Sequence, residues 1–279
     1  NRIASYDLVT GLLISTWNPN ANGIVYSIDV YGDTVYIGGA FTTITNSGTV
    51  RNRMAALNAN ATAAPYATGW DPSITGATGA AVYALKVSAD GTTVFAGGFF
   101  NTVKGIVARN NLASVDASGG NPTAFDPVGG GTVRALALYS TNLAVGGDFK
   151  SVNGALRNHL ASIDMTTGQA TSWDPNLLGG TGTPSVYSMV ADGGRLYVGG
   201  NFTTVGGTTR NRLAAFDITT GALNSWDGNS GGIVRKLLVS GTTLYVGGEF
   251  TMIGSPSQVT RNRLAAFDLV TGSLSTTFN

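Results

Sequence analysis

Two acidic residues, Asp148 and Glu249, share one position of a repeated Gly-Gly-x-Phe phrase, and Asn201 holds that position in the repeat between them. Glycoside hydrolases use a pair of carboxylates, one of which donates a proton while the other acts as nucleophile or base. The two residues therefore raise the hypothesis of a glycan-active hydrolase or lyase. We favour the alternative that these are solvent-facing positions of a repeated scaffold, and we assign no catalytic residue.

A row of aromatic and arginine residues shares one position of a short apolar segment that recurs along the chain. Such side chains can bind a sugar or a peptide by stacking and hydrogen bonding, so a lectin is a further alternative. The competing interpretation is that they pack between repeats. The members of this first-strand row are Tyr26, Tyr83, Arg134, Tyr187 and Arg235.

The sequence gives little indication of a metal site or of a catalytic nucleophile. His159 is the only histidine and cysteine is absent, so neither a transition-metal site nor a Ser-His-Asp triad is indicated. Calcium could be held by Asp and carbonyl oxygens, but no Asp-x-Asp-x-Asp loop is present. We therefore predict no cofactor.

The remaining charges mostly recur once per repeat, which indicates a structural role. Each Asp ends a strand before a turn, which is a Thr-Gly turn for all but Asp116, and its carboxylate can accept bonds from backbone N–H groups there. Pairing of Arg with Asp between repeats is a further expectation, since partly buried charges need partners. The recurring residues are Arg51, Arg109, Arg157, Arg210 and Arg261, with Asp116, Asp164, Asp217 and Asp268.

These residues belong to a repeat with a period near fifty, which marks a repeat architecture. Its fullest copy, at 185–227, contains four short apolar segments bounded by Gly, Asp and Asn, and the tight turn Asp192-Gly193-Gly194 joins the first two. Four short strands joined by hairpins are typical of a β-propeller blade. The pattern predicts a single all-β domain of five four-stranded blades, at about 24–72, 82–127, 132–175, 185–228 and 232–279, plus a half-blade at 1–19.

Residues 1–19 and 261–279 have interchangeable patterns, and either segment could add the third and fourth strands to the strand pair at 232–250. A five-bladed ring needs only one of them, so the other half-blade is surplus. Alternatives are a six-bladed ring with one incomplete blade, an open stack of the same sheets, or a piece of a longer array. An unpaired edge favours pairing with another chain, so we expect self-association through one terminus. Deletion of 1–19 is then expected to leave a folded monomer.

Glycine pairs inside the second strand indicate a bulge or a close backbone approach. Together with the Arg-Asn-x-Leu-Ala phrase and the closing Thr-Gly-x-Leu-x-x-x-Phe/Trp, the Gly-Gly-x-Phe phrase resembles the delta-60 type of β-propeller repeat. That resemblance covers essentially the whole chain and implies a bacterial surface or secreted protein with a binding or structural role. A weaker likeness, at 213–226, is to the tryptophan-docking repeat of quinoprotein propellers, which bind pyrroloquinoline quinone and calcium.

Composition agrees with a location outside the cell. The net charge is +1 and only 11% of the 279 residues are charged, so no nucleic-acid partner is indicated. No run of 18 apolar residues exists, so no membrane span is predicted. The chain opens inside a repeat, and we interpret it as a mature form or an excised segment. We therefore expect a non-enzymatic extracellular or cell-surface module, adhesive or structural, that binds protein or glycan or assembles with like subunits.

Overall fold

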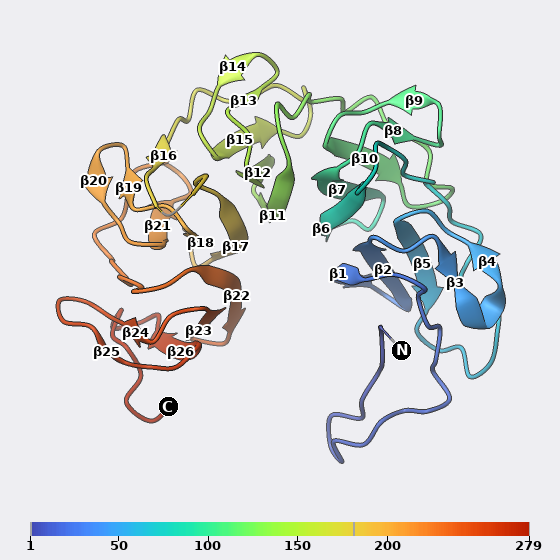
Figure 1. Cartoon of the computed structure of the whole chain (residues 1–279), viewed down its shortest axis with the longest axis horizontal. Helices are drawn as coiled ribbons and strands as arrows, with labels where there is room; N and C mark the ends of the chain where they lie inside the picture. Colours follow the sequence, from blue (N-terminus) through green and yellow to red (C-terminus); the bar gives the residue numbers. More distant parts are fainter. Residues whose placement is uncertain (1, 181, 279) are drawn as a thin grey trace. The chain divides into compact units, whose positions relative to one another are not determined.

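The computed structural model describes residues 2–180 and 182–278, and in that part the only helix is the 3-10 turn η1 (Thr45–Ser47). All other regular elements are short strands in antiparallel sheets, so the predicted all-β fold is confirmed. The chain forms two compact units, Asn1–Val133 and Arg134–Asn279. Each repeat contributes one large sheet of three strands, each five to seven residues long, and we call these sheets blades 1 to 5 (Figure 1).

The first unit holds the half-blade and two blades. In the half-blade a single bridge joins Tyr6 and Leu13. Blade 1 is β1 (Val25–Tyr31), β2 (Thr34–Gly39) and β5 (Met54–Asn58), and blade 2 is β6 (Ala81–Val87), β7 (Thr93–Phe99) and β10 (Leu112–Asp116). Their small outer hairpins are β3 (Thr43–Ile44) with β4 (Thr49–Val50), and β8 (Thr102–Val103) with β9 (Val107–Ala108).

The second unit holds three blades built in the same way. Blade 3 is β11 (Val133–Tyr139), β12 (Asn142–Gly147) and β15 (Leu160–Asp164); blade 4 is β17 (Val186–Asp192), β18 (Arg195–Gly200) and β21 (Leu213–Asp217); blade 5 is β22 (Val234–Ser240), β23 (Thr243–Gly248) and β26 (Leu264–Asp268). The outer strands are β13 (Ser151–Val152), β14 (Ala155–Leu156), β16 (Leu177–Leu178), β19 (Thr204–Val205), β20 (Thr208–Thr209), β24 (Met252–Ile253) and β25 (Val259–Thr260).

The fourth strand of each blade is shorter than the sequence pattern suggests. In blade 4 it is a single bridge, from Phe216 to Leu223. The chain then leaves the sheet because Trp226, three residues later, donates its indole Nε1–H to the Gly272 carbonyl of blade 5 at 3.0 Å. The closing aromatic therefore serves the contact between blades rather than the ladder of its own blade.

The glycine pairs have two separate causes. A Cβ on the second glycine of blade 4, Gly200, would lie 2.1 Å from the Ser185 carbonyl oxygen of its own blade. A Cβ on the first glycine, Gly199, would lie 2.5 Å from Val234 Cγ1 of the next blade. The Phe of the same phrase fills the gap and is buried in every blade. The predicted close backbone approach is thus confirmed.

The docking of Trp173 onto the Thr-Gly turn of blade 4 predicts a stability difference between two glycines. Gly221 has φ +72 and a Cβ there would lie 2.5 Å from Trp173 Cδ1, whereas Gly11 has φ +69 and nothing within 4 Å. We expect Gly11→Ala to cost about 1–2 kcal/mol of backbone strain and Gly221→Ala to cost about 1–3 kcal/mol more through overpacking. Urea unfolding of both variants measures the difference, and equal losses would contradict it.

Candidate functional site

The first-strand row lies at β-bulges. The register between the first two strands shifts at Tyr26, Tyr83, Tyr187 and Arg235, so each of these residues stands at a break in the regular ladder. Bulges re-aim side chains and are frequent beside binding sites. The local backbone therefore turns this row away from the regular ladder.

In the first unit the row is aromatic. The rings of Tyr26 and Tyr83 have centroids 5.0 Å apart and are inclined at 54°. Tyr26 stays exposed while Tyr83 is half-buried. The two rings form a small aromatic surface that crosses from blade 1 to blade 2.

In the second unit the row joins charge to an aromatic ring. The guanidinium carbons of Arg134 and Arg235 lie 5.8 and 4.4 Å from the Tyr187 ring centroid, within the range of cation–π attraction. Arg134 Nε donates to both Asp148 oxygens, at 2.9 and 2.8 Å. Arg235 Nε donates to Glu249 Oε1 at 2.8 Å. The structure thus brings five of the predicted site residues together as two ion pairs beside one tyrosine.

These ion pairs decide what the carboxylates can do. Burial alone would raise the pKa of Asp148, but the hydrogen bonds and the positive charge of Arg134 help to outweigh it, and the pKa lies below its usual value. A glycosidase proton donor needs a raised pKa. Since Glu249 is also paired with an arginine, the arrangement does not favour the acid–base pair of a hydrolase.

Asn201 has a different environment from the rest of the predicted set. It is 3% exposed, its Oδ1 accepts from the Ser185 backbone N–H at 2.5 Å, and its Nδ2 donates to the Thr183 carbonyl at 2.9 Å. The amide therefore holds the start of β17. His159 is also buried, with Nδ1 3.2 Å from the Gly147 carbonyl oxygen, and burial lowers its pKa, so the ring is neutral near pH 7.

The recurring arginines clamp backbone within their own blades. Arg157 donates from Nη1 to the Leu156 carbonyl at 2.7 Å and from Nη2 to the Thr171 carbonyl at 2.6 Å. Arg51 and Arg109 also lie 3.9 and 3.1 Å from the Asp that follows the closing aromatic of the same repeat. The expected pairing of Arg with Asp between repeats is therefore not what these contacts show. The same backbone clamp recurs at Arg51, Arg109, Arg210 and Arg261.

The recurring aspartates organise the Thr-Gly turns. Asp164 Oδ1 accepts from the backbone N–H groups of Thr166 and Thr167, at 2.9 and 2.8 Å. The same bonds recur at Asp217 and Asp268. Asp116 accepts from Gly119, Ser118 and Asn121 instead. These bonds stabilise the ionised carboxylate, so the aspartates are tied to turn geometry.

Asp116 predicts how stability depends on pH. Burial raises the pKa of this carboxyl, but its hydrogen bonds prevail and lower it from 3.8 to about 2. Because the folded pKa lies below the unfolded one, its stabilisation is complete above about pH 4 and is lost as pH falls toward 2. The midpoint of urea unfolding should therefore fall less steeply with decreasing pH, between about pH 4 and 2, in Asp116→Asn than in the wild type. The control Asp192→Asn, in an exposed hairpin turn, should keep the wild-type slope, and equal slopes in all three proteins would contradict this.

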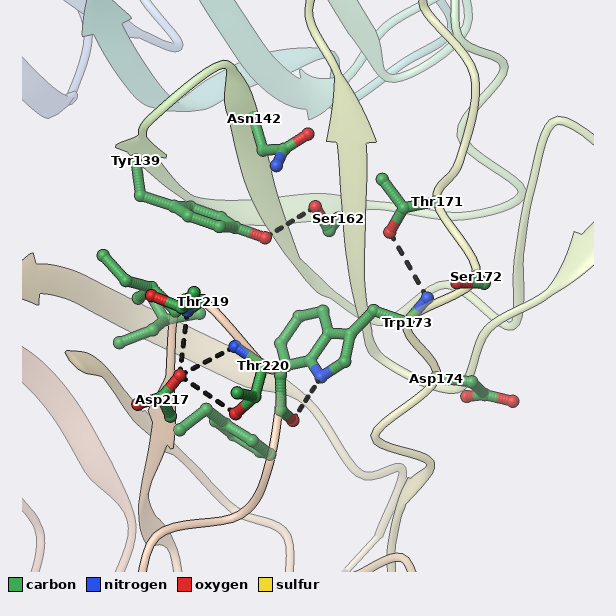
Figure 2. A pocket seen from close by; sticks show the side chains of 14 residues that line it. Tyr139, Asn142, Ser162, Thr171, Ser172, Trp173, Asp174, Asp217, Thr219 and Thr220 are labelled. Carbon is green, nitrogen blue, oxygen red and sulfur yellow. Dashed lines mark hydrogen bonds between the residues drawn. The ribbon is translucent and has the colours of Figure 1, made fainter. Parts of the chain in front are cut away.

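A pocket of about 460 Å³ opens between blades 3 and 4, and none of the predicted candidate binding residues lines it (Figure 2). Trp173 lies at its centre, with Tyr139 and Ser162 on one side of the indole and Asp217 and Thr220 on the other. The Tyr139 hydroxyl donates to Ser162 Oγ at 2.6 Å. The Trp173 indole N–H donates to the Gly221 carbonyl at 2.7 Å.

One substitution in the repeat explains this pocket. In the other blades the second strand carries an aromatic residue that meets the closing aromatic of its own repeat: Tyr36 with Trp70, Phe95 with Phe125, Tyr197 with Trp226, and Tyr245 with Phe278. Blade 3 has Ala144 at that position, paired with Ser162 across the sheet. The missing ring leaves the face of Trp173 open. This interruption was visible in the sequence as an alanine in an aromatic column.

Among the described residues, no group of three or more His, Cys, Asp or Glu side chains is arranged to hold a metal ion. In the same part of the chain, no helix is long and apolar enough to cross a membrane.

Comparison with known proteins identifies the class of fold. The family model of the Rax2 C-terminal beta propeller domain matches residues 160–278. The Pan2 WD40 domain of Neurospora crassa matches with a TM-score of 0.55 and 12% identity, over 91% of this chain and 65% of that one. A chain of the mitotic checkpoint complex matches with a TM-score of 0.57 and 14% identity, over 98% and 71%.

The extracellular domain of the putative one component system BT4673 from B. thetaiotaomicron matches with a TM-score of 0.51 and 16% identity, over 92% of this chain and 28% of that one. The present chain thus spans less than two thirds of the Pan2 domain and under a third of the BT4673 chain. A search of curated proteins finds no significant match. Together these likenesses confirm the β-propeller fold, and at such identities they describe fold alone.

Proposed function

We propose that this chain is a non-enzymatic, extracellular interaction module that assembles with copies of itself through its terminal blade faces. A propeller fold supports a role in protein interaction, because each blade presents turns and edges on a rigid sheet. The delta-60 resemblance and the weakly charged composition support a cell-surface location. The observation that carries the proposal is a pair of complementary faces on the first and last blades.

Within each unit, neighbouring blades meet in one repeated way. The first glycine of the second strand faces the first valine of the next blade: a Cβ on Gly38, Gly146 or Gly199 would lie 2.5–2.7 Å from Val82, Val186 or Val234. The next blade also buries an apolar residue of its first strand. The exposed fractions of Leu85, Met189 and Leu237 are 4%, 7% and 4%.

Blade 5 is the last blade of the second unit, and its outward face has this pattern with no further blade of that unit to cover it. No side chain lies within 4 Å of a Cβ built on Gly247, whose nearest neighbours are backbone oxygens at 4.0 Å. Leu264 is 50% exposed, although its equivalents Met54, Leu160 and Leu213 are fully buried. Blade 5 therefore presents a ready-made surface for the first strand of another blade.

Blade 1 carries the matching surface on β1. Ile28 and Val30 are 53% and 56% exposed, although the Ile28 equivalents in other blades are buried. The half-blade covers only the outer part of this face, where Ile3 and Trp17 pack on Ile37 and Leu57. At the blade 4–5 contact the first strand of blade 5, β22, is covered by the first two strands of blade 4, β17 and β18. By analogy, β1 would be covered by a hairpin formed from the first two strands of another blade.

We assign this hairpin to β22–β23 of a second copy. Ile3-Ala4-Ser5-Tyr6-Asp7 has the same pattern as Leu264-Ala265-Ala266-Phe267-Asp268, which pairs with β23. Residues 3–7 of one copy can therefore replace residues 264–268 beside β23 of another copy. Such an exchange of equivalent segments is a low-cost route to association, as in domain swapping. The exchange also buries Ile28 and Val30, so the assembly is head to tail.

An engineered disulfide tests this assembly, because the chain has no native cysteine. By analogy with Gly199 and Val234, the proposal places Gly247 of one copy against Val25 of the next. The double variant Val25→Cys/Gly247→Cys should form dimers and longer ladders on a non-reducing gel. As control, Gly199→Cys/Val234→Cys should give only an intrachain disulfide, since a Cβ on Gly199 would lie 3.2 Å from Val234 Cβ.

Each outcome of the experiment has a definite meaning. Interchain disulfides that disappear on reduction support assembly with a second copy. A monomer that migrates faster than the reduced form would show that one chain closes on itself and would overturn the proposal. Free thiols in the test variant, with an oxidised control, would overturn it as well.

A further inference from the structure

We propose that the pocket beside Trp173 binds a neutral saccharide of one or two sugar units. This inference goes beyond the proposed assembly, because the pocket lies between blades 3 and 4 and shares no residue with the terminal faces. Its volume of about 460 Å³ falls in the range of small-molecule sites, about 300–1,000 Å³.

The lining has the chemistry that recognises sugars. Trp173, Tyr139 and Phe216 supply aromatic surface for the C–H face of a pyranose ring. Thr171 and Thr219 supply hydroxyl groups that donate or accept hydrogen bonds. Ser162 is 1% exposed, and its hydroxyl holds the Tyr139 side chain in place. Such a mixture of aromatic surface with a few placed polar groups is typical of ligand pockets.

The charged residues that line the pocket favour a neutral ligand. No Lys, Arg or His is among the described residues that line the pocket, which disfavours phosphates and acidic sugars. Asp217 is the inner carboxylate, and its three turn hydrogen bonds all end on Oδ1, at 2.7–2.9 Å. Oδ2 is therefore the oxygen that a ligand hydroxyl would meet.

The central ring is held in place before any ligand arrives. The Trp173 indole N–H is bonded to the Gly221 carbonyl at 2.7 Å, and its ring meets Phe216 edge to face at 5.1 Å and 89°. A fixed aromatic platform lowers the entropy cost of binding. The same geometry occurs at the blade 4–5 contact, where Trp226 lies between Tyr197 and Phe267. Only the alanine at 144 leaves the Trp173 ring accessible.

The repeat itself supplies a variant that should close the pocket without disturbing the fold. Blade 5 carries Ser240, Tyr245 and Ala266 where blade 3 carries Tyr139, Ala144 and Ser162. The triple variant Tyr139→Ser/Ala144→Tyr/Ser162→Ala therefore copies a combination that this protein already contains. In blade 5 the Tyr245 ring meets the closing aromatic Phe278 edge to face at 5.4 Å. A milder variant, Ser162→Ala, removes one hydroxyl. Its matched control is Ser114→Ala, the same position in blade 2.

Saturation-transfer NMR and calorimetric titration of the full chain test the proposal, with glucose, galactose, mannose, N-acetylglucosamine, cellobiose and maltose as probes and choline as a cationic comparison. We expect at least one sugar to bind, the triple variant to lose at least tenfold in affinity, and Ser114→Ala to match the wild type. Circular dichroism checks that the variants fold, and Ser162→Ala gives a weaker second readout.

Three outcomes would overturn the inference. The first is no binding by any of the six sugars. The second is unchanged affinity in a folded triple variant, which would place the bound sugar elsewhere on the chain. The third is binding of choline alone, which would make the pocket an aromatic cation site. None of these results bears on the disulfide test, so the two proposals can fail separately.

Discussion

Replacement of Trp17 by alanine is expected to destabilise the first unit by about 3–5 kcal/mol, the usual cost of removing a buried large aromatic side chain. Trp17 is 7% exposed and packs in one cluster with Ile3, Ile37 and Leu57. Its indole N–H also donates to the Asn58 carbonyl of blade 1 at 2.9 Å. Both the packing and the hydrogen bond are lost in the variant.

Urea unfolding followed by circular dichroism measures this loss. Leu8→Ala is the matched control, because Leu8 lies in the same half-blade and is fully exposed. It should change the free energy of unfolding by no more than about 0.5 kcal/mol. A Trp17→Ala variant as stable as the control would show that the half-blade does not pack on blade 1.

The same contacts change what deletion of residues 1–19 should do. The terminal pattern alone suggested a folded monomer without the segment. In the structure the half-blade is part of the core of the first unit, and Tyr66 donates its hydroxyl to the Thr16 carbonyl at 3.1 Å. Deletion is therefore expected to destabilise blade 1 as well as to remove the exchanging strand, so point variants test assembly better.

The sequence predicts most of the blade because its local signals agree. Asp192-Gly193-Gly194 predicts a hairpin turn, and the strands β17 and β18 meet there, with Asp192 and Arg195 paired. The turn predicts where the second strand starts, at Arg195, which is observed. Its apolar pattern continues to Phe202, but the observed strand is Arg195–Gly200 and ends two residues earlier. Turn chemistry and strand propensity depend on residues a few positions apart, so the local sequence pattern is sufficient to predict turns and strands.

Features that depend on neighbouring blades were not predictable in the same way. The loop after Phe202 gave no strand pattern, yet it forms the outer hairpin of β19 and β20, two residues each. The placement of Asn201 against the backbone of Ser185 depends on how β17 begins, and position in the phrase alone does not show it. The pocket beside Trp173 exists because Ala144 replaces an aromatic residue. The sequence shows this alanine in the aromatic column, but it does not show that the column faces the closing aromatic of each repeat.

Alanine at Gly199 and at Gly247 should have opposite consequences, although both are the first glycine of the same phrase. A Cβ on Gly199 would lie 2.5 Å from Val234 Cγ1 and 3.3 Å from Leu237 Cγ, inside the blade 4–5 contact. We expect Gly199→Ala to destabilise the second unit by about 1–3 kcal/mol, because overpacking displaces the two sheets. Urea unfolding measures it, and a stability equal to wild type would mean that these blades separate without cost.

Gly247→Ala tests the equivalent position in blade 5, where no side chain packs against the glycine. No side chain lies within 4 Å of its added Cβ, and the backbone oxygens at 4.0 Å tolerate a methyl group. Folding should be unchanged or stabilised by about 0.4–1 kcal/mol, since alanine restricts the unfolded chain. If a second copy seats Val25 there, the same methyl group meets the valine as it would at Gly199, and association should weaken at least tenfold in sedimentation velocity. Unchanged association in a fully folded Gly247→Ala protein would exclude this face from the assembly contact.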